Sequence, residues 1–360
     1  MTTAVSTLER RPQAKRATSD YAELLNQVRE AGLLRRRHSY YIVKIAGTVG
    51  AFALAWVAFA MIGDSWYQLI VAGALGILFT QLAFLGHEAA HRQIFRSGKV
   101  NDWFGIVFAN LFVGLSYGWW MNKHSRHHAN PNKIGKDPDI EDLVIAFTPE
   151  QAKQRSGLAA RLTGKQGYFF FPLLLLEGIN LHKDALITAF TGDTVKQRRL
   201  EITFLAVRLI SVTAIPFVFL SPGLAFAFLG VHLAVFGLYM GASFAPNHKG
   251  MPLLEARDNV NFLQRQVLTS RNIHSNWFNN WLMGGLNFQV EHHLFPSMPR
   301  PNLVATQKIV KAFCEQRDVR YTEVSLLQSY AAVVRYLNRV GLGERDPFEC
   351  PMIASLRPRS

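Results

Sequence analysis

Histidines in this 360-residue chain gather in three short clusters. The clusters read HEAAH at 87–91, HSRHH at 124–128 and QVEHH at 289–293. On a helix, side chains three or four residues apart share one face, so the first cluster can offer two imidazoles to one metal ion and the second can offer two or three. The adjacent histidines of the third cluster point in different directions, so two neighbouring ions can each take one. Residue types and spacing together indicate metal binding.

An eighth histidine, His248, follows the last long apolar run and can reach the same layer. Eight imidazoles exceed the ligand set of one tetrahedral ion, so they suit two ions that each keep an open position. Imidazole binds zinc, copper, iron and nickel, so the residues alone do not select the metal. The predicted ligands are His87, His91, His124, His127, His128, His248, His292 and His293.

The first cluster also matches the pattern of zinc proteases, in which Glu88 would act as the general base. Intramembrane proteases carry such a motif near a spanning helix. A protease needs only one further metal ligand and would leave the second and third clusters unused. The protease is therefore the weaker alternative.

Long apolar runs surround the histidine clusters. Each run is close to the roughly 20 residues that cross a hydrocarbon core of about 30 Å. The sequence therefore predicts an all-α integral membrane protein with four transmembrane helices and a helical cap that holds the histidines. The predicted spans are 42–62, 67–86, 202–220 and 224–242.

Two further apolar stretches are not predicted to cross the membrane. The stretch 103–120 is short, aromatic and rich in glycine, and we interpret it as a re-entrant or interfacial helix. A crossing there would put the first two histidine clusters on opposite faces of the membrane. The stretch 168–190 mixes apolar and charged residues and is interpreted as an interfacial helix. Arg208 and His232 lie inside spans, a position that favours a functional role.

Charge predicts the orientation. The net charge is +14, and the short turns 63–66 and 221–223 contain no lysine or arginine. The positive-inside rule then places both termini, the segment 87–200 and all three clusters in the cytosol, in a multi-pass protein of the cell membrane. Because basic residues flank apolar runs, the anionic membrane surface is the expected partner, and nucleic acid is not. No cleavable signal peptide is expected, because the first forty residues are polar.

The chain is predicted to have three parts. Residues 1–40 form a basic cytosolic segment, disordered over 1–18 and helical over 19–34. Residues 41–310 form the membrane domain. Residues 311–360 form cytosolic helices and a tail, with a helix over 301–316 crossing into this part and an amphipathic helix over 323–341.

The three clusters, in this order and with two spans between the second and the third, resemble the histidine boxes of membrane fatty acid desaturases. The resemblance covers about residues 40–310. QVEHHLFP, with glutamine in the place of a first histidine, resembles the acyl-lipid and linoleoyl-CoA (front-end) branch. Each box alone is a weak signal, whereas the three together are specific.

The resemblance implies an oxidoreductase with a non-haem di-iron centre, which uses dioxygen and external electrons to place a cis double bond in an acyl chain. By this likeness the eight histidines above are iron ligands, and Gln289 binds iron directly or through water. Asp137, Asp139 and Glu291 are expected to orient ligands. Trp277, Phe278, Trp281 and the stretch 103–120 are candidate walls of an acyl tunnel, although a place in an interfacial belt or an ordinary core is the commoner role for any one of them.

The resemblance also implies partners. The substrate is an acyl-CoA or the acyl chain of a phospholipid, and membrane lipid surrounds the spans. The sequence contains no His-Pro-Gly-Gly haem motif, so a separate ferredoxin or similar carrier and its reductase are expected to deliver electrons. A related di-iron hydroxylase or ketolase is the main alternative, and a non-catalytic lipid-binding protein is disfavoured because all three boxes are intact.

Overall fold

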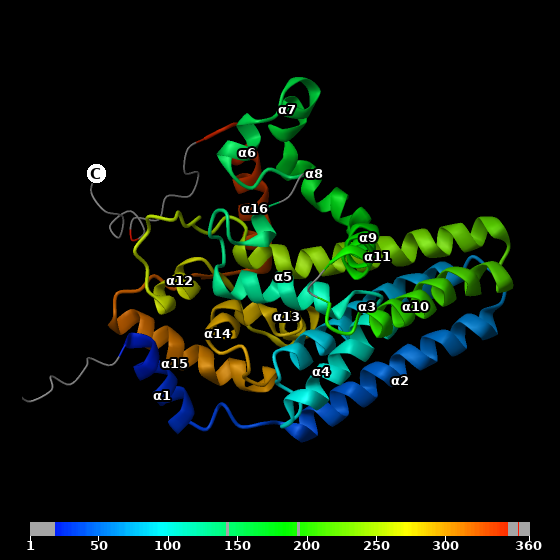
Figure 1. The fold of residues 1–360 in the computed structure, drawn as a ribbon, viewed down its shortest axis with the longest axis horizontal. Coiled ribbons are helices and arrows are strands. Elements are labelled where there is room, and N and C mark those ends of the chain that lie inside the picture. Colours follow the sequence, from blue (N-terminus) through cyan, green and yellow to red (C-terminus); the bar gives the residue numbers. More distant parts are fainter. Residues whose placement is uncertain (1–18, 142–143, 193–194, 345–351, 353–360) are drawn as a thin grey trace, which may run out of the picture.

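The structure is a computed structural model that describes residues 19–141, 144–192, 195–344 and 352. The predicted disorder of residues 1–18 and most of the C-terminal tail lie outside the described residues. The chain is almost entirely helical, and its long helices extend together to one side while the shorter elements gather at the other (Figure 1). The helices are α1 Asp20–Glu30, α2 His38–Ile62, α3 Gln68–Ala90, α4 Gly98–Ile106, η1 Val107–Val113, α5 Tyr117–Ala129, η2 Pro138–Ile140, α6 Pro149–Lys153, α7 Gly157–Thr163, α8 Gln166–Leu173, η3 Leu174–Leu176, α9 Glu177–Thr191, α10 Arg198–Phe219, α11 Pro222–His248, α12 Phe262–Leu268, α13 Trp277–Leu282, η4 Leu286–Phe288, α14 Gln289–Leu294, η5 Arg300–Asn302, α15 Leu303–Gln316 and α16 Leu326–Gly341.

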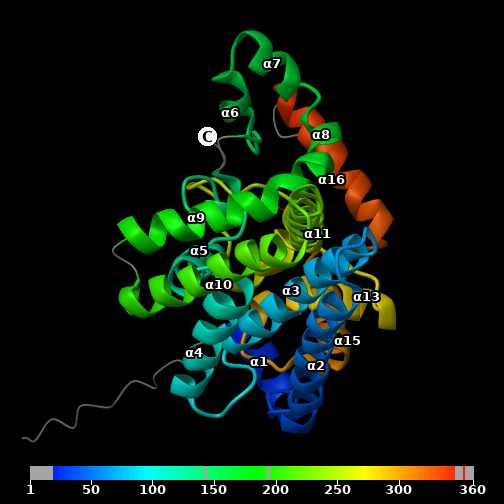
Figure 2. The same cartoon turned by 90° about the vertical axis from the view of Figure 1, so that its right-hand side faces the viewer.

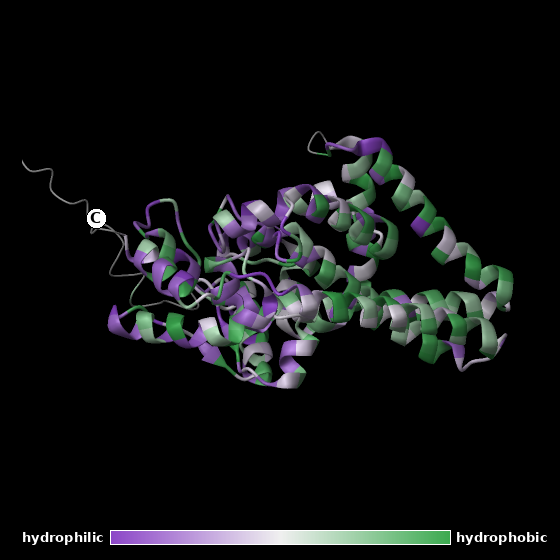
Figure 3. Cartoon of the chain, turned by 90° about the horizontal axis from the view of Figure 1, so that it is seen from below, coloured by the Kyte–Doolittle hydropathy of each residue, from purple (hydrophilic) through white to green (hydrophobic). Residues whose placement is uncertain are grey.

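Four of these helices, α2, α3, α10 and α11, are long and apolar enough to cross a membrane. They have 22 to 27 residues each, and at 1.5 Å per residue this exceeds the length of a hydrocarbon core. Apolar residues cover this end of the molecule, and polar residues concentrate at the opposite end (Figure 3). The prediction of an all-α membrane protein with four spans is confirmed, apart from one two-residue strand pair in the cap.

Two spans are longer than predicted at the ends that carry histidines. Helix α3 continues to Ala90 and α11 continues to His248, whereas the apolar runs end at 86 and 242. His87 and His248 therefore lie within the last turns of spanning helices, not beyond them. The helices continue because their polar last turns are buried in the cap, where protein instead of lipid surrounds them.

Helices α3 and α11 form the centre of the bundle. Gly76 of α3 lies so close to α11 that an added Cβ would be 2.9 Å from the carbonyl oxygen of His232. Any larger side chain would push the two helices apart. In contrast, most of α2 faces outward, as the view along the bundle suggests (Figure 2). The two spans that end in predicted ligands are thus the most tightly packed pair.

The segment between the first two histidine clusters is sharply bent. Residues Gly98–Val113 and Tyr117–Ala129 form two helical parts that meet at 113°. Gly114 makes the turn with a φ of 92°, a left-handed conformation that suits glycine. This bend replaces the single helix predicted over 103–120, and it favours a re-entrant path because both ends of the segment reach the same group of histidines.

The predicted interfacial helix over 168–190 is broken into α8, η3 and α9. Pro172 lies near the end of α8 and removes one backbone donor there, which accounts for the interruption. Helix α9 packs against α10 and α11, and with 15 residues it is too short to count as a span.

The cap is built around its own apolar core. Leu24 of α1, Leu294 of α14 and Phe313 of α15 belong to this core and are almost fully buried. The strands β1 Asn272–Ile273 and β2 Glu323–Val324 form a short parallel pair that ties α14 and its neighbours to the C-terminal part. The predicted boundary at residue 310 falls within α15. Helix α16 packs across the cap against α8 and α11.

Candidate metal centre

The structure brings all eight predicted ligands together, in two groups. Within each group the candidate ligand atoms lie within 4.8 Å of one another. The histidines come from the ends of α3 and α11 and from α5 and α14, so every part of the centre is attached to a helix. The five-histidine group is His87, His91, His124, His128 and His292, and the three-histidine group is His127, His248 and His293.

Neighbouring histidines separate into different groups. His124 and His128 are one turn apart on α5 and face the five-histidine group, whereas His127 faces the other. In the same way α14 gives His292 to one group and His293 to the other. The prediction that adjacent histidines serve two neighbouring ions therefore agrees with the geometry.

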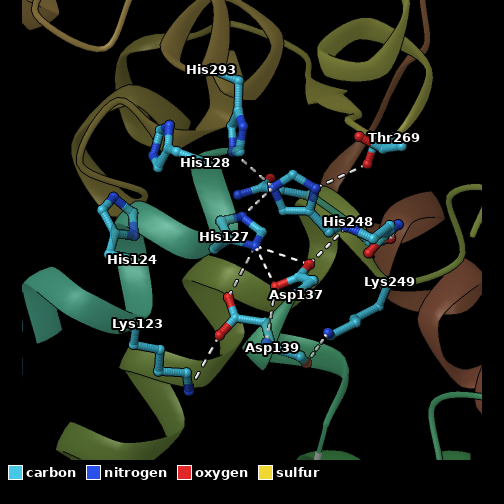
Figure 4. A network of polar contacts seen from close by, with 12 residues as sticks. Lys123, His124, His127, His128, Asp137, Asp139, His248, Lys249, Thr269 and His293 are labelled. Atoms are coloured by element: carbon cyan, nitrogen blue, oxygen red, sulfur yellow. Dashed lines mark hydrogen bonds and ion pairs between the residues drawn. The ribbon is translucent and has the colours of Figure 1, made fainter. Parts of the chain in front are cut away.

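Hydrogen bonds fix the rings of the three-histidine group (Figure 4). The Nδ1 atoms of His127, His248 and His293 lie 2.9–3.0 Å from three acceptors, the Asp137 carboxylate, the Thr269 carbonyl and the Gln266 side-chain oxygen. Each acceptor requires an N–H on Nδ1, which leaves a lone pair on Nε2 of the neutral ring.

Those three Nε2 atoms face one another. The Nε2 of His248 lies 3.2 Å from that of His127 and 3.1 Å from that of His293. Lone pairs at this separation repel unless a cation lies between them. The donor set therefore fits a metal ion that takes Nε2 from each ring.

The five-histidine group has the same character. The Nε2 of His91 lies 2.7 Å from that of His124, and the Nε2 of His128 lies 3.1 Å from that of His292. The Nε2 of His87 is buried and has no hydrogen-bond partner among the described residues. A buried nitrogen without a partner is costly, and a bound metal ion would satisfy it.

Burial favours the neutral form of His91, His292 and His293, whereas at His127 the carboxylates of Asp139 and Asp137 outweigh burial and raise the pKa. Burial lowers the pKa of His91 to about 3, and it holds the pKa of His292 and His293 well below the ordinary value of a histidine. The neighbouring imidazoles of the groups act in the same direction on His292 and His293. Neutral imidazole is the form that binds metals, so these three rings can take a metal ion without first losing a proton.

Two of the predicted acidic residues, Asp137 and Asp139, contact the imidazole of His127. Asp137 accepts from its Nδ1, and Asp139 lies 3.4 Å from the same atom while pairing with Lys123 at 3.2 Å. Burial alone would raise the pKa of the Asp137 carboxyl, but the charge and hydrogen bond of His127 outweigh it and hold that pKa below its usual value. Asp137 therefore remains an anion that orients His127.

Replacing Asp137 with asparagine is expected to weaken metal binding by roughly 10- to 100-fold, because His127 loses the charge that fixes its tautomer. Metal retained per chain after dialysis against a graded chelator series measures the effect. Glu141→Gln is the matched control, since Glu141 is an exposed carboxylate of the same loop. Equal metal retention in both variants would show that Asp137 does not orient a ligand.

Gln289 lies beside the three-histidine group. Its side-chain nitrogen is 2.8 Å from Nε2 of His248, and its oxygen accepts from the Asn247 side chain at 3.2 Å. The assignment of nitrogen and oxygen in an amide follows from such networks. Gln289 lies beside Nε2 of His248, the nitrogen that would bind the ion. An amide at this position can reach a metal ion or a water molecule bound to it.

Glu291 is not in contact with an imidazole in the described network. Its carboxylate accepts from the Asn272 side chain at 2.6 Å and from the Tyr321 hydroxyl at 2.7 Å. Burial raises the pKa of Glu291 to about 7. The Asn272 side-chain oxygen also accepts from the backbone N–H of Val290 at 2.9 Å. Glu291 therefore anchors α14, which carries two ligands, to β1.

Glu88 does not have the setting of a protease base. Its buried carboxylate forms an ion pair with the buried guanidinium of Arg300. A general base needs access to a water molecule on the metal, whereas the Glu88 side chain is buried and paired with Arg300 instead. The structure thus disfavours the protease alternative.

An apolar pocket lies next to the five-histidine group. His87 belongs both to the five-histidine group and to the pocket lining, so the apolar pocket lies directly beside the candidate metal ligands. The predicted wall residues Trp277, Phe278 and Trp281 do not line this cavity and are 80%, 52% and 38% exposed. The lining residues are Ala83, Phe84, Gly86, His87, Ala109, Val113, Leu115, Tyr117, Trp120, Met240 and Phe244.

Several supporting residues were not identified from the sequence. Gln266, Thr269 and Asn272 fix the rings or helices of the site, yet they lie outside the histidine clusters. Their side chains are ordinary polar ones without a spacing signal, so only the folded structure identifies them.

The family model for fatty acid desaturases matches residues 64–325. The chain belongs to the fatty acid desaturase family. The resemblance of the three histidine boxes to this family is therefore confirmed, and the matched domain covers the spans α3, α10 and α11, the bend and both histidine groups.

Named relatives agree with this assignment. The desaturase chain is 28% identical to an acyl-lipid (9-3)-desaturase of Physcomitrium patens over 93% of its length, which spans 65% of that protein. It is 28% identical to the Delta(6)-fatty-acid desaturase fat-3 of Caenorhabditis elegans, over 91% of the chain and 76% of the relative. It is 29% identical to a Delta(8)-fatty-acid desaturase of Euglena gracilis, over 91% of the chain and 80% of the relative. The chain thus spans under two thirds of the moss relative.

Proposed function

We propose that this family member is an oxygen-dependent fatty acyl desaturase, which places a cis double bond in an acyl chain at a non-haem di-iron centre. One observation carries the proposal. Two groups of imidazoles with converging Nε2 atoms lie directly against an apolar cavity. An unreactive methylene chain needs both a strong oxidant and a dry, shaped site, and the two are adjacent here.

Each histidine group is proposed to hold one iron. His127, His248 and His293 provide three nitrogens to the second ion, and Gln289 fills a further position directly or through water. Asp137 and Asp139 orient His127, while Glu291 keeps α14 in register. When bound, the two iron ions supply the redox chemistry by which dioxygen takes two hydrogens from neighbouring carbons.

The cavity residues position the substrate. An acyl chain along Ala83, Gly86 and Ala109 passes His87, so only the carbons at that depth come near the metal centre. The apolar lining excludes water from the reacting carbons and fixes which bond is desaturated. The carrier of the acyl group is CoA or a phospholipid, in a cell membrane whose cytosolic side faces the histidine cap.

Electron partners follow from the stoichiometry. Removal of two hydrogens with reduction of dioxygen to two waters consumes two further electrons and two protons. The acyl chain does not provide them, so a separate ferredoxin or similar carrier with its reductase is part of the proposal.

The test is to express the chain in a host that supplies a ferredoxin and reductase, and to analyse both its fatty acids and the metal of the purified protein. The expected result is a new unsaturated acyl chain and about two irons per chain, one for each histidine group. An oxygenated product would instead identify a hydroxylase or ketolase. One zinc per chain, with no iron taken up on reconstitution, would overturn the proposal.

A further inference from the structure

Helix α10 carries no predicted ligand, yet it holds two charged side chains inside the protein. Glu201 is 2% exposed and Arg208 is 5% exposed. They are seven residues apart, so they lie on one face of the helix about 10 Å from each other along its axis. Burying a charged side chain in a spanning helix costs free energy, so each of these two charges needs a stabilising partner.

Arg208 contacts the end of η1. Its Nε donates to the carbonyl oxygen of Phe112 at 2.5 Å, and its guanidinium lies over the ring of Phe79, 4.1 Å from the centroid. The imidazole Nε2 of His182 lies 3.3 Å from the next carbonyl, that of Val113. The last carbonyls of a helix lack backbone partners and form its negative end, so a cation is favourable there.

Glu201 contacts the start of α5. Its carboxylate accepts from the Ser116 hydroxyl at 2.7 Å and from the backbone N–H of Gly118 at 3.1 Å. The Ser116 hydroxyl oxygen in turn accepts from the N–H of Trp119 at 3.2 Å. The first amides of a helix form its positive end, so an anion is favourable there. The two charges of α10 therefore match the two helix ends that they contact.

Those two helix ends meet at the bend of 113°. A Cβ on Gly114 would lie 2.9 Å from the His182 ring and 3.3 Å from Arg208. A Cβ on Gly118 would lie 3.2 Å from the Glu201 carboxylate. Glycine at both positions lets the charged side chains approach the backbone on either side of the turn.

We propose that Glu201 and Arg208 are positioning residues that together clamp this bend and so set the geometry of the metal centre and the acyl cavity. Helix α5 gives His124 and His128 to one histidine group and His127 to the other, so its direction affects both ions. The preceding η1 gives Ala109 and Val113 to the cavity wall. The link to iron rests on the function proposed above, whereas the clamp itself does not.

Hydrogen exchange tests the clamp without any metal. Glu201→Gln and Arg208→Gln are purified in lipid nanodiscs and compared with Arg199→Gln, an exposed arginine in the first turn of the same helix. Peptides within 107–129 are expected to exchange about fivefold faster in the two clamp variants, which is the factor expected when a helix cap is lost. Arg208→Lys keeps the cation and is expected to restore most of the protection. Unchanged exchange in Glu201→Gln and Arg208→Gln would overturn the clamp.

A second readout tests the link to the site. Both clamp variants are expected to retain less than half of the iron of the unmodified chain, while Arg199→Gln retains all of it. The double variant is expected to retain more iron than the product of the fractions that the two single variants retain, because both changes release the same bend. Normal iron and an unaltered double-bond position in variants with fast exchange would overturn the link. An unmodified chain that takes up no iron would overturn the proposed function instead, and the exchange result would still decide the clamp.

Discussion

Replacing His248 with alanine is expected to abolish desaturation, with a loss on the order of 100-fold or more, and to reduce bound iron from about two to about one per chain. His248 is the one predicted ligand that lies outside the three boxes. Its Nε2 lies between those of His127 and His293, at 3.2 and 3.1 Å. Without it, the three-histidine group has two imidazoles and Gln289, too few nitrogens to hold an ion firmly. Iron per chain and fatty acid analysis of expressing cells measure the two effects.

His274→Ala is the matched control for this variant. His274 follows β1 in the cap and is exposed, and it belongs to neither histidine group. It is expected to keep both irons and full activity. If His248→Ala also kept two irons per chain and normal activity, the assignment of His248 as a ligand would be wrong, and the second ion would need another donor set.

The gathering of the eight histidines could be predicted, because the chemistry of imidazole is visible in residue type and spacing. A separation of four residues on a helix places His87 with His91 and His124 with His128, and the structure has both pairs. The sequence does not predict which histidine of each adjacent pair faces which group. That choice depends on the rotation of α5 and α14 about their axes, which tertiary packing sets.

The bundle was predictable from the length of the apolar runs, but the ends of its helices were not. Apolar periodicity stops where lipid stops, whereas α11 continues to His248 because the cap buries its last turn. The bend at Gly114 could not be predicted from the sequence for a related reason. Two residues of α10, Glu201 and Arg208, contact it from about 85 to 95 positions away in the sequence, and no local pattern reports such contacts.

Aromatic composition was a partial guide to the apolar cavity, because the predicted stretch 103–120 supplies Tyr117, Trp120 and three further residues to its lining. Trp277 and Phe278 are exposed at the surface, while the lining includes Ala83, Gly86 and Ala109, which have little or no side chain. Aromatic residues of a membrane protein also gather at the lipid interface, which gives the same composition without a tunnel.

Replacing Ala109 with phenylalanine is expected to reduce desaturation of long acyl chains on the order of 100-fold while iron per chain stays unchanged. Ala109 lines the pocket together with His87 and Tyr117, so a ring at position 109 would occupy the space next to them. The side chain of residue 109 is no ligand, and its backbone carbonyl, which accepts from the N–H of Gly114, is retained. Overpacking costs about 1–3 kcal/mol in the worst case, so the fold should persist. Product analysis, iron content and the melting temperature in detergent separate the effects.

Two further variants make this result interpretable. Ala206→Phe introduces the same side chain at an exposed position of α10 and is expected to keep normal activity. Gly86→Ala adds only a methyl group to the lining, with its nearest neighbour at 3.8 Å, and is expected to remain active but to shift the double bond along the chain. A fully active Ala109→Phe would mean that the acyl chain does not pass His87 through this cavity. Loss of activity together with loss of iron would instead point to damage at the bend, since Ala109 lies on η1 only five residues before Gly114.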